Sequence, residues 1–285
     1  MTTEELKTFI VLTKVKNFTI AAEQLFIAQS TVTNRISELE KEVGKRLFTR
    51  SPKTVKLTES GEIFLRYAER IIDLQEGSIA EMHARSAYKK NFTVGAINAT
   101  YEAYVKPVLD ECLRPDENTT VKLVIGHSLD LIQKLQDEVI DLAFSSIPWK
   151  KRGYDCTVFD VDRLVLVTAK GMNAYPKGIT EEDLGNIPYL MCNFSLSEIG
   201  FFIRSLFPKE HVFKLEVDNS SKLLPFLQKG LGYSFLPYKM VKTELESGEL
   251  EEVKVRFQAP TVTTYLLHKH SFDPKPVLEY LGQGK

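Results

Sequence analysis

Hydrophobic and polar positions follow two different rhythms along this chain of 285 residues. Up to about residue 86 the apolar positions recur every three or four residues, which is the period of amphipathic helices. From residue 92 onward short apolar runs alternate with amphipathic stretches, as they do in domains where strands and helices take turns. The polar stretch 88–91 lies at the change. The pattern predicts three regions, 1–58, 59–88 and 89–285.

Residues 1–58 contain three short helical patterns followed by a hairpin pattern. The expected elements are helices at 4–14, 19–26 and 31–43 and strands at 47–50 and 55–58. Asn17 should end the first helix and Thr19 should cap the second, while Ala28 to Ser30 form the turn before the third. Three helices and a two-stranded wing predict a winged helix-turn-helix, a fold that places its third helix in the major groove of DNA.

The third predicted helix has one apolar face and one hydrogen-bonding face. Val32, Ile36 and Leu39 form the apolar stripe, which we expect to be buried. The candidate DNA-binding residues are Gln29, Ser30, Thr31, Thr33 and Asn34 on this helix and the turn before it, and Arg50, Pro52 and Lys53 on the wing. The two amides and Thr33 are expected to face base edges, and the wing cations to meet the backbone or the minor groove.

The net charge of −1 is unevenly distributed along the chain. Residues 1–66 hold 11 basic and 8 acidic residues, whereas the rest of the chain is acidic on balance. Within 28–58 there are 7 basic and 3 acidic residues. The surplus is small, but it lies where a phosphate backbone would meet the predicted helix and wing.

From residue 59 a single helical pattern runs without interruption to about residue 86. Phe64, Ala68, Ile71, Gln75 and Met82 recur at spacings close to those of heptads. A helix of this length extends beyond what so small a domain can cover. We therefore predict that it pairs with the same helix of a second subunit.

Residues 89–285 alternate strand and helix patterns in two groups. The expected strands are 92–97, 121–125, 141–144, 163–168, 189–192, 213–217, 232–236 and 261–268. The early strands are apolar throughout, as in a parallel sheet that helices cover on both faces. The chain should cross between the groups near Asp160 and again near Gln258. This predicts two lobes, 92–160 with 260–285 and 161–259, separated by a cleft.

Small polar residues follow the predicted strands in both lobes. In open α/β sheets ligands bind at this edge, near helix N-termini. The candidate ligand-binding residues are Asn98, Thr100, Ser128, Ser145, Asn193 and Asn219. Each alone could be an ordinary helix cap, but their recurrence in both lobes favours a binding site. Their donor groups, with Asp218 as the conspicuous acid, favour a small polar carboxylate, and Phe194 and Phe201 leave an aromatic ligand open.

Several motifs in the first 66 residues occur together in one known family. They are Ala21-Ala22-Glu23-Gln24-Leu25, Gln29-Ser30-Thr31-Val32-Thr33, Leu39-Glu40, Gly44, Leu47-Phe48-Thr49-Arg50 and Leu57-Thr58-Glu59-Ser60-Gly61. In order and spacing the sequence resembles the LysR-type transcriptional regulators over about 3–66, and beyond residue 91 the architecture alone matches. Ser30, Asn34 and Lys53 depart from the residues that are common in the family.

This resemblance implies an α/β protein with an N-terminal winged helix-turn-helix and a linker helix, followed by a two-lobed α/β effector domain that resembles type 2 periplasmic binding proteins. It implies a regulator without enzymatic activity, which binds double-stranded promoter DNA as a homodimer or homotetramer and responds to a small-molecule effector. RNA polymerase is a further candidate partner. Neither a cofactor nor a metal is expected.

Motifs for other functions are missing or incomplete in the sequence. There is no G-x-S-x-G, P-loop or G-x-G-x-x-G motif, and His268 and His270 lack an evident third metal ligand. Cys112, Cys156 and Cys192 lie far apart, so we expect ordinary reduced thiols, with a thiol-based redox signal as the alternative. With neither a signal peptide nor a long apolar run, a cytoplasmic protein without membrane contact is expected.

Overall fold

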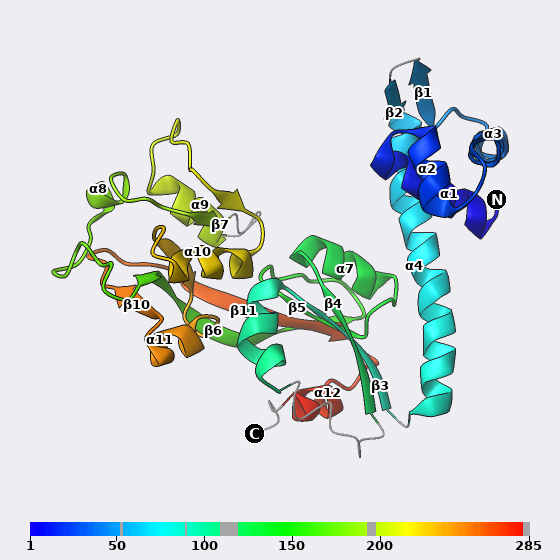
Figure 1. Ribbon diagram of the computed structural model, residues 1–285. Coiled ribbons are helices and arrows are strands. Elements are labelled where there is room, and N and C mark those ends of the chain that lie inside the picture. Colours follow the sequence, from blue (N-terminus) through cyan, green and yellow to red (C-terminus); the bar gives the residue numbers. More distant parts are fainter. Residues whose placement is uncertain (52–53, 89, 109–118, 193–197, 282–285) are drawn as a thin grey trace. The chain divides into compact units, whose positions relative to one another are not determined.

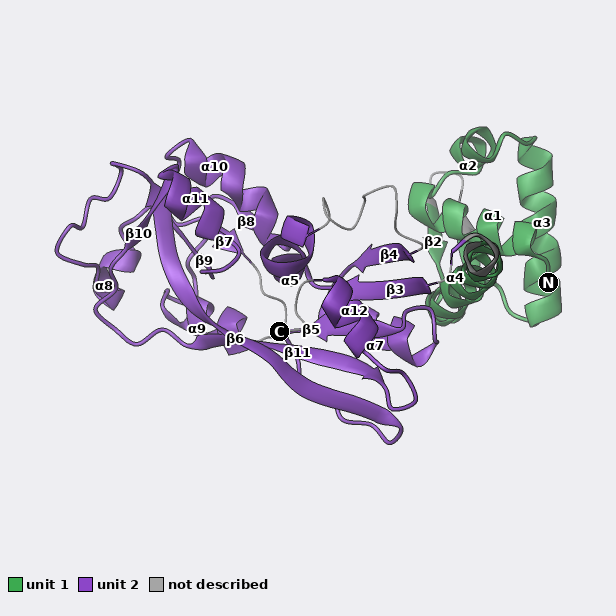
Figure 2. Cartoon of the chain, turned by 90° about the horizontal axis from the view of Figure 1, so that it is seen from below, with its two compact units in different colours: residues 1–87 green, residues 88–285 purple. Residues whose placement is uncertain are grey.

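The computed structural model describes residues 1–51, 54–88, 90–108, 119–192 and 198–281. The chain divides into two compact units, 1–87 and 88–285, which are coloured separately in Figure 2. Unit 1 contains α1 (Thr3–Val15), α2 (Phe18–Leu25), α3 (Gln29–Val43), β1 (Phe48–Ser51), β2 (Thr54–Leu57) and α4 (Glu59–Ala87) (Figure 1). The predicted winged helix-turn-helix and its long following helix are therefore confirmed.

The core of unit 1 lies where α1, α3, the wing and the start of α4 meet. Phe9 is fully buried and its ring lies 5.3 Å from that of Phe48 and 5.2 Å from that of Phe64. The predicted apolar stripe of the third helix is confirmed, because Val32, Ile36 and Leu39 are all fully buried. The opposite face of α3 is thereby fixed toward solvent.

Two helix starts differ from the sequence predictions. Asn17 does not simply end the first helix: its Oδ1 accepts hydrogen bonds from the N–H groups of Thr19 (2.9 Å) and Ile20 (3.1 Å), so Asn17 and not Thr19 caps α2. The third helix begins at Gln29 rather than at residue 31, because the carbonyl of Ala28 already accepts from Thr31 N–H at 2.9 Å. An asparagine side chain is a stronger N-cap than threonine, which explains the first difference.

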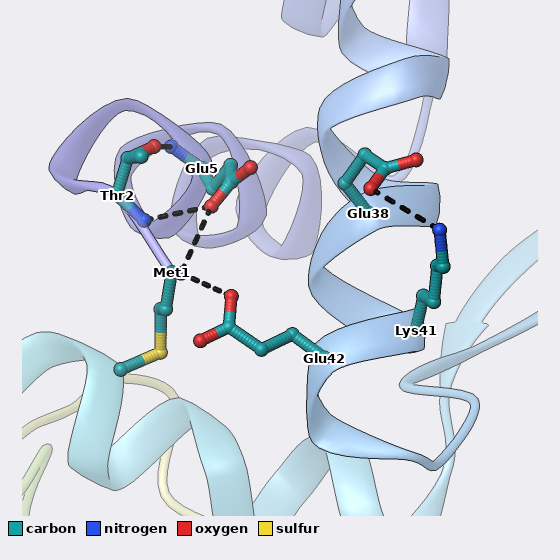
Figure 3. A network of polar contacts seen from close by, with 6 residues as sticks. All are labelled: Met1, Thr2, Glu5, Glu38, Lys41 and Glu42. Carbon is teal, nitrogen blue, oxygen red and sulfur yellow. Dashed lines mark hydrogen bonds and ion pairs between the residues drawn. The ribbon is translucent and has the colours of Figure 1, made fainter.

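A network of polar contacts connects the beginning of α1 with the end of α3 (Figure 3). Thr2 and Glu5 form a capping box, with Thr2 N–H donating to Glu5 Oε2 at 2.7 Å. The α-ammonium group of Met1 contacts the Glu42 carboxylate, and this hydrogen bond raises the pKa of the ammonium group. Glu38 and Lys41 pair at 3.9 Å along the outer surface of α3. Of these contacts, the one between Met1 and Glu42 joins the start of α1 to α3.

Unit 2 is built on a mixed sheet. Its strands are β3 (Lys90–Ala96), β4 (Thr119–Ile125), β5 (Leu142–Ser145), β6 (Tyr154–Ala169), β9 (Ser234–Pro237), β10 (Leu250–Val253) and β11 (Thr261–Lys269), and β7 (Met191–Cys192) pairs with β8 (Glu216–Val217) separately. Within the described residues the seven strands follow the order β10-β6-β11-β5-β3-β4, with β9 also on β6. Strands β3, β4 and β5 pair in parallel, which confirms the prediction for the early strands, and the other pairings within this sheet are antiparallel.

Helices connect the strands of unit 2 and pack against the sheet. They are α5 (Asn98–Thr100), η1 (Tyr101–Val105, π-helical), α7 (Ser128–Gln136), α8 (Glu181–Leu184), α9 (Glu198–Ser205), η2 (Ser220–Leu223), α10 (Leu224–Gln228), α11 (Lys242–Ser247) and α12 (Lys275–Tyr280). We call β3–β5 with α5, η1, α7 and α12 lobe I, and β7–β10 with α8–α11 and η2 lobe II. Each lobe has its own buried clusters, around Phe144 in lobe I and around Phe235 in lobe II.

Strands β6 and β11 run from one lobe to the other as a long antiparallel pair, from Tyr154 opposite Lys269 to Arg163 opposite Thr261 (Figure 2). The predicted strand at 163–168 is thus only the second half of β6. The pairing shifts register between Thr264 and Tyr265, which leaves Phe159 as the extra residue of a β-bulge. Bulges bend and twist a strand, so this one marks the point where the ribbon changes direction between the lobes.

A charged cluster surrounds that bulge and involves both lobes. Lys239 Nζ lies 2.7 Å from Asp160 Oδ1, and the Tyr104 hydroxyl donates to the same carboxylate. Burial alone would raise the pKa of Asp160, but the hydrogen bonds from Lys239 and Tyr104 outweigh it and the pKa is lowered. Burial raises the pKa of the neighbouring Asp162, which accepts from Lys239 N–H at 2.8 Å. These contacts restrain the angle between the lobes in this conformation.

Candidate functional site

The exposed face of α3 carries the residues that were predicted to contact DNA. Gln29, Ser30 and Asn34 are exposed, and Thr31 and Thr33 are half-buried beside the fully buried stripe. The Thr33 hydroxyl donates to the Gln29 carbonyl at 3.1 Å. Since its one proton is directed to the backbone, Thr33 can offer a base edge a hydrogen-bond acceptor, which suits the amino groups of adenine or cytosine.

The wing is described only in part. The backbone of Arg50 lies in β1 opposite Val55. Pro52 and Lys53 lie outside the described residues. At the base of the wing, Glu40 Oε1 accepts from the N–H groups of Leu47 (2.8 Å) and Phe48 (3.1 Å), which joins the wing to α3.

Sequence reasoning missed a basic hollow beside the wing. It has a volume of about 540 Å³ and is lined by Ser37, Glu40, Lys41, Gly44, Lys45, Arg46 and Phe48. The local surplus of basic residues in 28–58 was the available signal, but the surplus did not show which cations share a surface. Lys45 and Arg46 are both exposed there and can contact phosphates.

Unit 2 contains a cavity of about 520 Å³ with walls from both lobes. Its lining comprises Ile97, Asn98, Ala99, Ile125, Gly126, His127, Ser128, Leu129, Asp130, Ser146, Ile147, Cys192, Ile199, Asp218, Asn219, Ser220, Pro237 and Val262. Three of the predicted ligand-binding residues, Asn98, Ser128 and Asn219, are among them. Thr100 and Ser145 are buried and do not line the cavity, and Asn193 lies outside the described residues.

The helix-cap interpretation applies to one of the three lining residues. Asn219 is a true cap, since its Oδ1 accepts from Ser221 N–H at 3.1 Å. Asn98 and Ser128 are instead the first residues of their helices, after the N-cap residues Ile97 and His127. Neither of these N-cap residues forms a side-chain cap hydrogen bond in the described structure.

Two helices therefore begin at the cavity with uncapped first turns. The first of them continues from α5 through η1 to residue 108, and the second is α7. The first N–H groups of a helix have no acceptor within the helix, and they carry the positive end of its dipole. Asn98, Ala99, Ser128 and Leu129 place such groups at the cavity wall. This arrangement is suited to an anionic group.

Polar contacts join the two lobes across the cavity. Asn98 Nδ2 donates to Ser220 Oγ at 3.4 Å, and Ser221 Oγ donates to Asn98 Oδ1 at 3.5 Å. His127 Nε2 lies 3.9 Å from Asp218 Oδ2, with the histidine in lobe I and the aspartate in lobe II. A change in the angle between the lobes would break these contacts.

The cavity also has acidic residues in its wall. Asp218 was noted from the sequence, but Asp130 in the first turn of α7 was missed. Its position between Leu129 and Leu131 in a helical pattern gave no sign that it would share a wall with Asp218.

Cys192 lines the cavity as well, and it is buried. Burial raises the pKa of its thiol to about 12. The thiolate is the reactive form of cysteine, so this thiol is poorly suited to sensing oxidants at neutral pH. Cys156 is half-buried, and Cys112 lies outside the described residues.

Thr100 was predicted to bind the ligand, but the structure buries it outside the cavity. Its hydroxyl is buried with no hydrogen-bond partner among the described residues. Thr100→Val keeps the shape and removes this hydroxyl, so we expect unit 2 to become more stable by about 1 kcal/mol. Urea unfolding followed by the fluorescence of Trp149, the one tryptophan of the chain, measures this change.

Thr168→Val is the matched control, because the buried Thr168 hydroxyl donates to the Gly232 carbonyl at 2.9 Å. That variant should lose about 1 kcal/mol, since the carbonyl is left without its donor. Destabilisation by Thr100→Val of the same size would contradict this expectation and show that the Thr100 hydroxyl forms a stabilising hydrogen bond in the folded protein.

Among the residues that the structure describes, no group of three or more His, Cys, Asp or Glu side chains is placed to hold a metal ion. His270 Nδ1 lies 3.0 Å from Asp155, whereas His268 makes a contact with its neighbour's carbonyl. None of the described helices has both the length and the apolar character of a membrane span.

Two family models match the chain. The model of the bacterial regulatory helix-turn-helix protein, lysR family, matches residues 3–62, and the model of the LysR substrate binding domain matches residues 86–281. The HTH-type transcriptional regulator CitR of Bacillus subtilis (strain 168) is 27% identical over 259 residues, which cover 89% of this chain and 88% of that protein. A probable RuBisCO transcriptional regulator of Thalassiosira pseudonana is 28% identical over 268 residues, with 89% and 87% covered.

Solved structures agree with these matches in fold. The crystal structure of CbnR, a LysR family transcriptional regulator, aligns with a TM-score of 0.69 at 19% identity and covers 100% of this chain and 98% of that one. Full-length BenM aligns with a TM-score of 0.51 at 20% identity and covers 99% and 96%. Since the substrate-binding model alone matches more than half of the chain, this protein is a member of the LysR family of DNA-binding transcriptional regulators.

Proposed function

We propose that this regulator binds double-stranded promoter DNA through the exposed face of α3 and the wing, and that a small ligand with a carboxylate, held between lobes I and II, controls its action. The observation that carries the proposal is the pairing of a solvent-facing, uncharged polar helix face in unit 1 with a cavity in unit 2 where two uncapped helices begin. The site of action would be the cytoplasm, where promoter DNA and RNA polymerase are found.

On DNA, the exposed amides of Gln29 and Asn34 are proposed to contact base edges, together with the acceptor of Thr33. Ser30 and Thr31 lie in the same first turn and are proposed to contact the adjacent backbone, as are Arg50, Pro52 and Lys53 of the wing. The basic hollow at Lys45 and Arg46 extends the charged surface. A solved structure of full-length CbnR in complex with its target DNA shows that a chain of this fold can bind DNA.

Asn34→Ala tests the assignment of base contacts. Binding sites are first selected by the natural protein from a library of random duplexes, and each variant is then titrated on a selected site and on unselected DNA. Asn34→Ala should cost about 1–3 kcal/mol on the selected site and little on unselected DNA, because one side-chain contact with a base is lost.

Lys53→Ala is the comparison variant, and it should weaken both kinds of DNA alike and reduce the salt dependence of binding. Equal weakening of selected and unselected DNA by Asn34→Ala would remove that residue from base recognition.

For the ligand, we propose contacts with the predicted residues Asn98, Ser128 and Asn219. The backbone N–H groups of Ala99 and Leu129 in the same cavity wall are further proposed contacts. Binding of a carboxylate at these N–H groups would strengthen the contact between α5 and η2, which lie in different lobes. An aromatic acid is the second candidate, because the wall also contains Ile125, Leu129, Ile147, Ile199 and Val262.

Assembly is the third part of the proposal. The surface of α4 exposes large apolar side chains, Ile63, Tyr67, Ile71, Leu74, Ile79 and Met82. Most of them recur at spacings of three or four residues, and contiguous exposed apolar surface is typical of protein interfaces. We propose that two copies pair through α4 as a homodimer, which can associate further into a homotetramer.

A further inference from the structure

The cavity between the lobes is lined by groups of opposite electrostatic character. At one wall the uncapped starts of α5 and α7 present N–H groups at Asn98, Ala99, Ser128 and Leu129. The carboxylates of Asp130 and Asp218 share the same cavity. A simple organic acid would use the N–H groups but would be repelled by the two carboxylates. The wall is therefore complementary to a ligand that carries both charges.

The two carboxylates are available for such a ligand. Within the described part of the chain, the basic side chain that lies within 4 Å of the Asp218 carboxylate is His127, with 3.9 Å between Nε2 and Oδ2, which is beyond hydrogen-bond distance. No hydrogen bond to the Asp130 side chain is recorded within the described part of the chain, and its place in the first turn of α7 leaves it exposed. An ammonium group with three donors could bind between these two acids.

The remaining wall is apolar. Ile97, Ile125, Ile147, Ile199 and Val262 contribute aliphatic side chains from both lobes and from β11. Their presence favours a ligand with a hydrocarbon part and gives a third point of recognition besides the two charges.

We propose that the ligand is a free α-amino acid with an uncharged, mainly apolar side chain. Its carboxylate binds at the starts of α5 and α7, its ammonium group lies between Asp130 and Asp218, and its side chain contacts the aliphatic wall. The inference rests on the proposed function, because it takes the same cavity and the same carboxylate contacts and adds the ammonium subsite.

Calorimetric titration of the full chain with matched sets of compounds tests the proposal. One set is L-leucine, isocaproate and isoamylamine, and a second is L-phenylalanine, hydrocinnamate and phenethylamine; in each set the second compound lacks the amine and the third lacks the carboxylate. At least one amino acid should bind about tenfold or more tightly than either of its partners, which is the ratio that one charge-assisted hydrogen bond supports. L-Alanine, L-valine and L-methionine complete the panel, together with benzoate, succinate and citrate.

Asp218→Asn should reduce this preference, so that the amino acid and its deaminated partner bind with similar affinity. Glu210→Gln removes a charge from an exposed position of lobe II away from the cavity, and it should leave the preference unchanged. Unfolding followed by Trp149 fluorescence establishes that both variants are folded.

The other outcomes separate the inference from the function on which it rests. Binding of isocaproate, hydrocinnamate, benzoate, succinate or citrate at least as tightly as any amino acid would overturn the ammonium subsite and leave the carboxylate site standing. Binding of amines alone, or of no compound in the panel, would overturn both. An unchanged preference in Asp218→Asn would remove Asp218 from the subsite.

Discussion

Gly61→Ala is expected to unfold the DNA-binding unit at a much lower temperature than the natural protein. A Cβ atom at this position would lie 2.2 Å from the Leu47 carbonyl oxygen and 2.8 Å from Leu57 Cδ2. The first of these atoms belongs to the backbone, so a rotamer change cannot relieve the clash. We expect a loss near or above the upper end of the about 1–3 kcal/mol that overpacking costs, and a fall in Tm of roughly 10 °C or more.

The clash is severe because the Leu47 backbone is held from two sides. Thr58 N–H donates to the Leu47 carbonyl at 2.9 Å, and the Leu47 N–H is bound by Glu40. The Thr58 hydroxyl accepts from Gly61 N–H at 3.0 Å and donates to the Arg46 carbonyl at 2.7 Å. Moving this segment would separate α3, the wing and α4 together, so DNA binding should be lost along with stability.

Gly77→Ala is the matched control in the same helix, because a Cβ at Gly77 would have no atom within 4 Å. It should stabilise α4 by about 0.5–1 kcal/mol. Far-UV circular dichroism follows the helices of unit 1, while Trp149 fluorescence reports unit 2 alone. Equal melting of Gly61→Ala and the natural protein by circular dichroism would contradict the close packing at this junction.

Ile71→Asp is expected to convert the protein to a monomer at concentrations where the natural protein is dimeric. Ile71 is 38% exposed within its own chain and lies in the middle of the apolar surface of α4. In a paired helix the new carboxylate would be buried without a partner, and an unpaired buried charge costs several kcal/mol. Sedimentation velocity measures the change directly.

Ala80→Asp serves as the control for that experiment. It adds the same charge to an exposed residue of α4, on the side away from the Ile63–Met82 surface. The control should remain a dimer, and both variants should retain the circular dichroism of a folded chain. A dimer of unchanged affinity in Ile71→Asp would show that subunits pair through another surface.

The type of most elements in unit 1 could be predicted from residue spacing alone. Val32, Ile36 and Leu39 determine which face of α3 is buried, and the same spacing leaves Gln29 and Asn34 at the surface. The predicted starts of α2 and α3 were less accurate than the predicted element types. A helix start depends on which side chain or carbonyl reaches a particular N–H group, and spacing does not show this. Gly61 was recognised as part of a motif, but the reason for a glycine there is visible only where α4 packs against Leu47 and the end of β2.

In unit 2 the sequence by itself determined that strands and helices alternate, which segments are buried, and that polar residues follow the strands. Only the tertiary structure decided which of these polar residues share a cavity. Asn98, Ser128 and Asn219 line it, Thr100 is buried, and Asp130 lines the same cavity as Asp218 although 88 positions separate them. The physical reason is that hydrophobic spacing fixes the buried face of each element through local geometry. The meeting of α5, α7 and η2, by contrast, depends on strand order, on the bulge at Phe159 and on contacts between residues far apart in sequence.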